Sequence, residues 1–219
     1  MAWEYLCCLV SSQFLCDISC GKISRMTRYR LSSLKRKKRN LDHEYRMRRT
    51  LKDYPKVYIA SANGIQRGVG QGLFAGKSLE RNEVVFFARG KTIALVVDTK
   101  KASMSYPNAI GLSKQRWLDP ASSNPLPYLN HSCDPNLGIR GARTFVALRD
   151  IDKDEHLTLD YSITECDPLW TLEKKCVCGT KLCRGTIRSI QFLPKHIFKK
   201  YLPNIPTKFK QIYEKEHTM

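Results

Sequence analysis

The sequence has no apolar run long enough to cross a membrane, because a spanning helix needs roughly 20 predominantly apolar residues. The longest candidate, residues 5–16, is shorter and contains Ser11, Ser12 and Gln13. Glu4 stands before this segment where a Sec-type signal peptide carries Lys or Arg, so we expect neither a membrane span nor such a signal. Nothing in the sequence favours a particular oligomeric state.

Paired cysteine patterns are largely missing as well. The chain has nine cysteines, an odd number, which together with the missing signal argues against a disulfide framework. The four cysteines within residues 1–20 lack the C-x-x-C spacing of a metal site. We therefore expect reduced thiols and look for a metal site among the five later cysteines.

Acidic residues are scarce, with 20 Asp and Glu against 38 Lys and Arg, for a net charge of +18. Residues 21–56 carry a net charge of +11 and residues 174–219 one of +9, whereas residues 57–173 are neutral. Such flanks suit a polyanion such as nucleic acid, and the alternative is a solvated surface. The basic run 35–39 suggests nuclear localisation or a nucleic-acid patch, unless it extends a charged helix over 41–53.

Long helical periods are few in what remains, and short apolar segments separated by turn residues predict strands. Glycines between 64 and 76 predict a turn-rich stretch around 73–75, and prolines between 98 and 127 predict a looser segment. The tail 191–219 suits one or two short helices. The fold class is therefore mainly β within α+β. The predicted strands are 57–60, 84–87, 93–97, 144–148 and 156–159.

Two polar features interrupt this pattern. The run Asn130–Asn136 contains Asp-Pro and reads as a turn whose Asn and His side chains offer donors and acceptors, although an ordinary capped turn fits equally well. Tyr161 ends a strand-like segment and is either a core tyrosine or a group that orients an amine.

Cys176, Cys178 and Cys183 form a C-x-C-x4-C pattern that resembles half of a structural zinc site. Zinc takes four ligands, so one must come from elsewhere, and by position Cys133 and Cys166 are the alternatives. If Cys133 supplies the ligand, the C-terminal segment folds back over the polar turn.

Together these motifs resemble the SET domain of protein lysine methyltransferases, over about residues 57–185. The three cysteines match the post-SET zinc motif of that family, in which Cys133 would be the fourth ligand. Small size, a missing pre-SET cysteine cluster and the unusual N-terminus also resemble bacterial SET proteins of the chlamydial effector type that act on host chromatin. The matching segments, in order, are 70–75 (GQGLFA), 130–136 (NHSCDPN), 147–151 (ALRDI) and 156–161 (HLTLDY).

The resemblance implies a SET fold of small sheets with a pseudoknot, plus short helices in the N- and C-terminal extensions. Its domains would be an N-terminal extension over 1–56, basic from 22, and the SET domain over 57–165. A post-SET zinc segment over 166–190 and a basic tail over 191–219 would follow.

The resemblance also implies roles for single residues. Tyr161 would be the catalytic tyrosine, the zinc ligands would be the four cysteines given above, and the substrate channel would contain Tyr106, Tyr128 and Leu159. S-adenosylmethionine would contact Gly70, Gln71, Gly72, Leu73, Phe74, Asn130, His131, Tyr161 and Trp170.

Some positions depart from the family pattern. Leu159 replaces the Phe or Tyr that helps to set the number of methyl groups, Pro127-Tyr128 replaces Arg-Phe, and Asp154-Glu155-His156 replaces Gly-Glu-Glu. None of these changes removes a core catalytic position.

The implied activity is methyl transfer from S-adenosylmethionine to lysine side chains of histones or histone-like proteins. The neutral centre would hold the peptide while the basic flanks contact DNA phosphates. The implied location is the nucleus or chromatin, reached after secretion if the protein is a bacterial effector, with the bacterial cytoplasm or nucleoid as the alternative. A catalytically silent chromatin or nucleic-acid-binding module and a non-enzymatic zinc protein are the competing interpretations.

Overall fold

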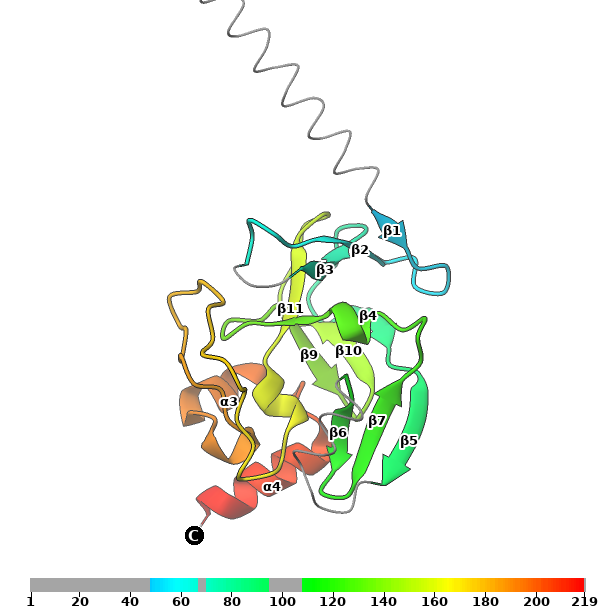
Figure 1. Ribbon diagram of the computed structural model, residues 1–219. Helices are drawn as coiled ribbons and strands as arrows, with labels where there is room; N and C mark the ends of the chain where they lie inside the picture. The colour runs from blue at the N-terminus through cyan, green and yellow to red at the C-terminus, as the bar shows by residue number, and fades with distance from the viewer. Residues whose placement is uncertain (1–47, 67–69, 95–107, 219) are drawn as a thin grey trace, which may run out of the picture. The chain divides into compact units, whose positions relative to one another are not determined.

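The computed structural model describes residues 48–66, 70–94 and 108–218, all within one compact unit, Met47–Met219 (Figure 1). The predictions for residues 1–47, which include the basic run 35–39 and the first four cysteines, lie outside the described residues, as does Tyr106. No helix among the described residues is long and apolar enough to cross a membrane.

Three small sheets make up most of this unit (Figure 1). Their strand orders are β1-β2-β3-β11-β8, β4-β10-β9 and β5-β7-β6. The strands are β1 (Arg49–Thr50), β2 (Val57–Ser61), β3 (Gln71–Ala75), β4 (Val84–Phe87), β5 (Gly90–Ala94), β6 (Ile110–Ser113), β7 (Arg116–Pro120), β8 (Asn130–His131), β9 (Leu137–Arg140), β10 (Thr144–Ala147) and β11 (His156–Leu159).

Helices are few and short, and the mainly β prediction is confirmed. Helices α3 (Lys195–Tyr201) and α4 (Thr207–His217) confirm the short helices predicted in the tail. Both begin directly after a proline, whose fixed φ and missing N–H suit the start of a helix. Single 3-10 turns cover Leu126–Tyr128, Tyr161–Thr164 and Ile190–Phe192.

The largest sheet brings distant segments together. Strand β2 pairs with all five residues of β3, and β11 lies antiparallel to β3 on its other side. Strand β8 is parallel to β11, with Asn130 opposite Thr158 and His131 opposite Leu159. A parallel pair cannot be closed by a hairpin, so the intervening chain must cross to another layer, where it forms β9 and β10.

Three sequence predictions are wrong in detail. The stretch read as turns around 73–75 is strand β3, the loose segment contains the β6–β7 hairpin, and residues 48–53 of the possible 41–53 helix instead contain β1. The described part of the 93–97 strand belongs to β5, which begins earlier, at Gly90. The prolines of 98–127 suggested a loose segment, but Pro120 is the last residue of β7, where a missing N–H is tolerated.

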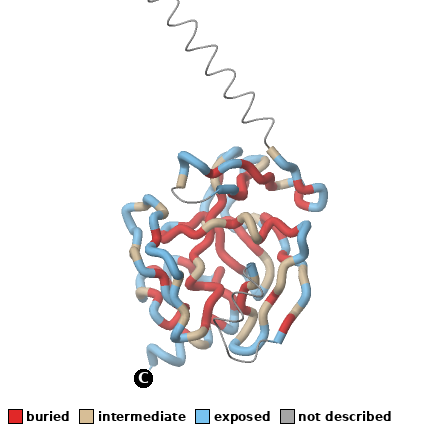
Figure 2. Tube along the Cα trace, viewed as in Figure 1, coloured by how far each residue is buried: buried red, intermediate tan, exposed pale blue. Residues whose placement is uncertain are grey.

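One hydrophobic core serves all three sheets and both helices, as the buried segments in Figure 2 show. It extends in sequence from Leu51 to Tyr213. Phe198 of α3 stacks on Tyr213 of α4 with ring centroids 3.7 Å apart, and Phe209 is fully buried. The C-terminal helices are therefore part of the domain core, and α3 contacts the polar turn through the Tyr201 hydroxyl, which donates to the carbonyl oxygen of Cys133 at 3.4 Å.

Candidate active site and metal centre

The β8–β11 pairing places the two polar features of the sequence side by side. Leu159 lies opposite His131, and two residues later the chain enters the 3-10 turn that starts with Tyr161. The backbone N–H of Tyr161 donates to Nδ1 of His131 at 3.2 Å, and the two rings lie 5.2 Å apart. Segments about 30 residues apart in the sequence thus form one site.

His131 links this site to a cysteine. Because Nδ1 accepts the Tyr161 N–H, the neutral ring carries its proton on Nε2, which lies 3.4 Å from Sγ of Cys133. The side chain is buried, and burial lowers the pKa of His131 to about 4. The imidazole is therefore neutral near pH 7 and acts here as a hydrogen-bonding bridge.

Tyr161 has a hydroxyl held by the backbone. Its O–H donates to the carbonyl oxygen of Leu129 at 2.9 Å. Burial raises the pKa of Tyr161 to about 12, so the phenol stays protonated at physiological pH. With its proton engaged, the hydroxyl oxygen still has lone pairs that can accept a hydrogen bond from an amine.

Asn130 connects the polar turn to the glycine strand. Its side-chain amide donates to the carbonyl oxygen of Gln71 at 3.1 Å and lies 3.2 Å from Nε2 of His156. A Cβ on Gly72 would lie 2.6 Å from that same Nε2, so only glycine leaves room for the histidine ring. The ring also stacks on Phe74 at 5.0 Å.

His156 is a site residue that sequence reasoning missed as a functional candidate. The only signal was the departure from the Gly-Glu-Glu pattern, which gave no role for an imidazole at this position. The structure surrounds it with Gly72, Phe74 and Asn130, all three predicted cofactor positions.

The remaining predicted residues differ in exposure. Leu73 and Phe74 are buried, whereas Gly70 and Gln71 are exposed at the open end of β3, and no atom would meet a Cβ on Gly70 within 4 Å. Leu159 lies in the hydrophobic core at 1% exposure, and Tyr128 is half-buried against that core. Their assignments to cofactor and channel stay predictions.

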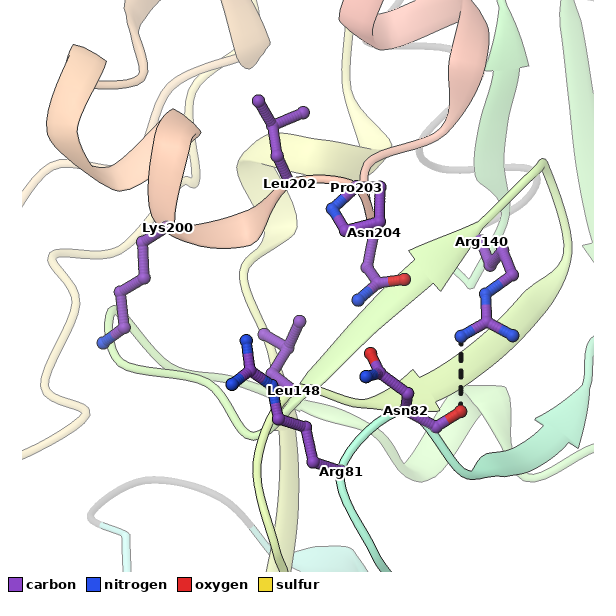
Figure 3. A pocket seen from close by; sticks show the side chains of 8 residues that line it. All are labelled: Arg81, Asn82, Arg140, Leu148, Lys200, Leu202, Pro203 and Asn204. Carbon is purple, nitrogen blue, oxygen red and sulfur yellow. Dashed lines mark hydrogen bonds between the residues drawn. The ribbon is translucent and has the colours of Figure 1, made fainter.

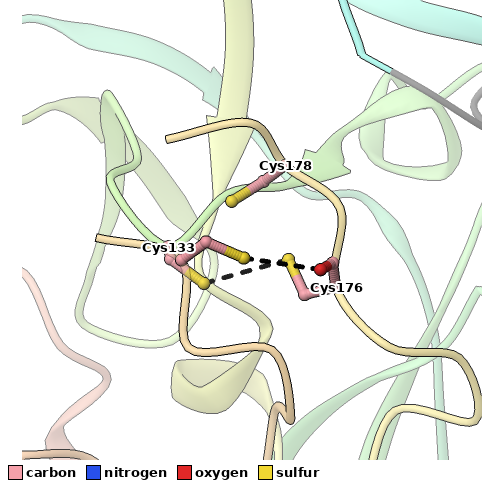
Figure 4. A group of neighbouring side chains, drawn as sticks. Cys133, Cys176 and Cys178 are labelled. Carbon is pink, nitrogen blue, oxygen red and sulfur yellow. Dashed lines mark hydrogen bonds between the residues drawn. The ribbon is translucent and has the colours of Figure 1, made fainter. Parts of the chain in front are cut away.

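A second centre lies next to His131. The sulfur atoms of the C-x-C-x4-C cysteines and Cys133 all lie within 4.8 Å of one another, and those of Cys133 and Cys176 are 3.9 Å apart (Figure 4). A tetrahedral site with Zn–S bonds of about 2.3 Å places sulfurs roughly 3.8 Å apart, so the arrangement suits a metal ion. Cys166, the alternative fourth ligand, is not part of this group.

The cysteine group packs against aromatic side chains that face the polar turn. Half-buried Tyr161, Trp170 and Cys178 contact a small buried cluster of Cys133, Cys176 and Ile187. Burial raises the pKa of Cys133, and the backbone N–H of Arg184, 3.3 Å from its sulfur, lowers it only in part. A bound cation would therefore be needed to hold this thiol as a thiolate.

A buried ionic network lies beneath both centres. Asp160, fully buried, accepts from the Arg184 guanidinium at 2.6 Å and from the Tyr201 hydroxyl at 3.0 Å. Arg184 follows the last cysteine of the group, and Tyr201 belongs to α3. Since Asp160 directly precedes Tyr161, this network ties the cysteine segment, the C-terminal helix and the tyrosine together.

Comparison with known proteins gives a consistent result for the central segment. Residues 70–162 match the SET domain family. The histone-lysine N-methyltransferase trithorax of Drosophila virilis is 29% identical over 151 residues, covering 63% of this chain and 4% of that protein. The human histone-lysine N-methyltransferase 2B is also 29% identical, over 63% of this chain and 5% of that protein.

The chain thus spans only a small fraction of the length of the curated relatives it matches. Among solved structures, a humanized mutant of the Chaetomium thermophilum Polycomb Repressive Complex 2 bound to the inhibitor GSK126 has 22% identity to the aligned part. That alignment covers 49% of this chain and 15% of the other, with a TM-score of 0.40.

Proposed function

We propose that this chain, whose residues 70–162 form a SET domain homologous with those of histone-lysine methyltransferases, is a protein-lysine N-methyltransferase. The observation that carries the proposal is the convergence at Tyr161. Its hydroxyl donates to the Leu129 carbonyl oxygen, and its backbone N–H donates to His131. His131 follows Asn130 in strand β8, which pairs with the strand that leads to Tyr161.

S-adenosylmethionine, when bound, supplies a methyl group on a positively charged sulfur. The residues present suit it: Gly70 is open, Gln71 is exposed, and Asn130 is half-buried at the same strand end. Gly70–Phe74, Asn130, His131 and Trp170 would hold the cofactor, with Trp170 packing over the adenine beside the cysteine group. The donors and acceptors of these residues serve to bind and orient.

Tyr161 would align the attacking lysine. Methyl transfer from a sulfonium is an in-line displacement, so positioning is the main task of the protein. The amine must be neutral, although a free lysine has a pKa near 10.4, and a dry channel beside a cationic sulfur favours the neutral form. The phenol, protonated at neutral pH, accepts an N–H of the amine and directs its lone pair, and it does not act as a base.

The four cysteines would hold a structural zinc ion in a post-SET arrangement. This part of the proposal is supported by the sulfur separations and by the all-thiol ligand set, which suits zinc. The ion would stabilise the segment that carries Trp170 and Arg184. Closed four-thiolate coordination leaves no position for a reacting group, so its role is structural.

Histones or histone-like proteins are the proposed substrates, and chromatin is the proposed place of action, because the relatives are named histone-lysine methyltransferases. Contacts of the basic flanks with DNA phosphates belong to the same proposal and are supported by the charge of +18. Delivery to a host nucleus as a secreted bacterial effector rests only on the resemblance to SET proteins of the chlamydial effector type.

Mass spectrometry of core histones and of nucleosomes, after incubation with the protein and S-adenosylmethionine, tests the proposal. We expect mass increases of 14 Da or its multiples on lysine. The same reaction with Tyr161→Phe should give none above background. Wild-type protein that binds the cofactor and nucleosomes but transfers no methyl group would replace the proposal by a silent chromatin-binding module.

A further inference from the structure

A groove with a volume of about 440 Å³ lies between the end of α3, the link to α4, and the β9–β10 hairpin (Figure 3). None of the residues assigned above to the cofactor, the substrate channel or the cysteine centre lines it. Its lining contains three cationic side chains, Arg81, Arg140 and Lys200, and no carboxylate. Volumes of this size are typical of ligand sites.

The three cations come from three separate parts of the chain. Arg81 belongs to the turn before β4, Arg140 ends β9, and Lys200 lies on α3. Cations brought together from distant segments repel one another, so an anion bound between them would reduce this repulsion. Figure 3 shows their side chains around one opening.

The cations differ in how far they are neutralised. Lys200 is paired with Asp134 at 2.6 Å, and Arg140 donates to the carbonyl oxygen of Asn82 at 3.2 Å. The guanidinium of exposed Arg81 has no hydrogen bond or ion pair within the described residues, since only its backbone N–H is used, toward Asp150. Two guanidinium groups can therefore still donate to an anionic ligand.

The floor of the groove is fixed by close packing. A Cβ on Gly138 would lie 2.8 Å from Cβ of Asn204 and 2.8 Å from Cδ2 of Leu148, so glycine is required there. The Ile139 N–H also donates to the carbonyl oxygen of Asn204 at 2.9 Å. The link between the helices is thus held against β9.

Asn204 supplies an unused polar group in this floor. Asn204 is 3% exposed, and its side chain points into the groove in Figure 3. Its amide oxygen has no hydrogen-bond partner among the described residues. An unpaired buried polar group is destabilising, so a ligand that pairs with this amide would gain from it. Since no side-chain hydrogen bond fixes this amide, it is free to turn its NH2 toward an oxygen of a ligand.

We propose that this groove binds the phosphate backbone of duplex DNA. Guanidinium groups match phosphate oxygens in charge and in their forked geometry, and a side-chain amide adds a neutral donor. The exposed Lys195 and Lys199 on α3 extend the positive charge beyond the groove. The choice of DNA among polyanions rests on the proposed action on histones, whereas the site itself does not depend on methyl transfer.

Fluorescence anisotropy of a labelled duplex of random sequence, titrated with the full chain at several salt concentrations, tests this site. The variant Arg81→Gln/Arg140→Gln removes two charges from the groove. Lys91→Gln/Arg116→Gln removes two charges from exposed positions on β5 and β7, in another sheet, and is the matched control. Circular dichroism and thermal melting of each variant confirm that it is folded.

We expect the groove variant to bind DNA about tenfold more weakly than the control and to reduce the slope of log K against log salt by about 1 to 2. Equal affinities of the two variants would overturn the proposal. Groove-dependent binding of a polyglutamate peptide without groove-dependent binding of DNA would overturn it in favour of an acidic protein partner. Millimolar inorganic phosphate that abolishes the difference at constant ionic strength would overturn it in favour of a small-anion site.

If the groove variant loses DNA affinity but keeps methyl transfer to free histones, the groove serves docking alone. If the wild-type protein transfers no methyl group and the groove still binds DNA, the proposed enzymatic function fails and this proposal stands. The two proposals are therefore tested separately by the same preparations.

Discussion

Tyr161 combines a half-buried ring with a hydroxyl whose proton is already donated to the Leu129 carbonyl oxygen. Tyr161→Phe removes one oxygen and leaves the ring, so we expect a loss of methyl transfer of about 100-fold or more, because alignment of the amine is lost. The free energy of unfolding should fall by only about 1–2 kcal/mol. Radiolabelled methyl transfer and urea unfolding measure the two effects.

Tyr213→Phe is the matched control. Tyr213 is buried, its hydroxyl has no hydrogen-bond partner among the described residues, and it lies on α4 away from β8 and β11. This variant should keep its activity. A Tyr161→Phe enzyme as active as Tyr213→Phe would contradict the assigned role.

His156 gives a prediction about pH. Burial lowers the pKa of His156 below its ordinary value, so the folded state favours the neutral ring that accepts from Asn130. A folded-state pKa below the unfolded one gives stability that is present above about pH 6.5 and is lost as the pH falls, because the unfolded chain takes up the proton first. His156→Gln stays neutral at every pH and should therefore lose less melting temperature between pH 7.5 and 5.5 than the wild type does. An equal loss of melting temperature between pH 7.5 and 5.5 in the two proteins would refute this.

Single residues also mark where sequence reasoning stops. Tyr161 and the four grouped cysteines lie in motifs with fixed spacing, so the sequence alone could propose a role for each of them. His156 and Arg184 lie in the same motifs, but their contacts are made across β3 and with Asp160, which no local spacing reveals. Residues whose role depends on non-local packing are the ones that were missed.

At the level of elements, the cysteine segment and α3 meet on Asp160. Arg184→Met leaves this carboxylate buried without its cation, and removing one partner of a buried ion pair costs about 3–5 kcal/mol. Tyr201→Phe removes one neutral donor and should cost about 1–2 kcal/mol. The double variant should cost less than the sum of the two, because both contacts stabilise the same charge.

Urea unfolding in the presence of zinc measures these three values. Arg188→Met is the control, because the Arg188 side chain lies over the exposed Phe192 ring and forms no ion pair among the described residues. If Arg184→Met and Arg188→Met have equal free energies of unfolding, the Asp160 contacts do not stabilise the packing of the cysteine segment against α3.

The proposed zinc site gives a further prediction at this scale. Cys133→Ser removes the only ligand that does not come from the C-terminal cysteine segment, so bound zinc and methyl transfer should be lost together. Cys166→Ala, which alters a buried cysteine outside the group, should keep both. Zinc content by atomic emission decides the question: one equivalent of zinc in Cys133→Ser would exclude Cys133 as a ligand.

Element boundaries were predictable where side-chain patterning dominates. Strands β2, β4 and β10 follow runs rich in β-branched and aromatic residues, and the structure confirms them and the predicted strand β11. Strand β3 was read as a turn because of its glycines, yet Gly72 is there to admit the His156 ring from the neighbouring strand. The sequence shows the glycine but not the residue that requires it.

For the whole molecule, the uneven distribution of charge separates two tasks. The neutral segment 57–173 contains Tyr161, the glycine strand and the polar turn, whereas residues 174–219 carry a net charge of +9. The proposed substrate, a basic histone tail, is not attracted by net positive charge, so under the proposed function the charged surface would serve another ligand. In a nucleosome, the neutral segment would bind the histone tail and the basic surface would bind the DNA next to it.

This division predicts how the substrate should change the rate. At low salt, methyl transfer to nucleosomes should exceed transfer to free histones, because DNA contacts concentrate the enzyme near the tail. Raising salt from 50 to 200 mM should reduce the nucleosome rate about 10- to 1,000-fold, as several phosphate contacts are lost, and should change the free-histone rate far less. Rates at equal histone concentration measure this. Equal activity on both substrates at low salt would show that the positive charge has no part in substrate choice and only keeps the chain in solution.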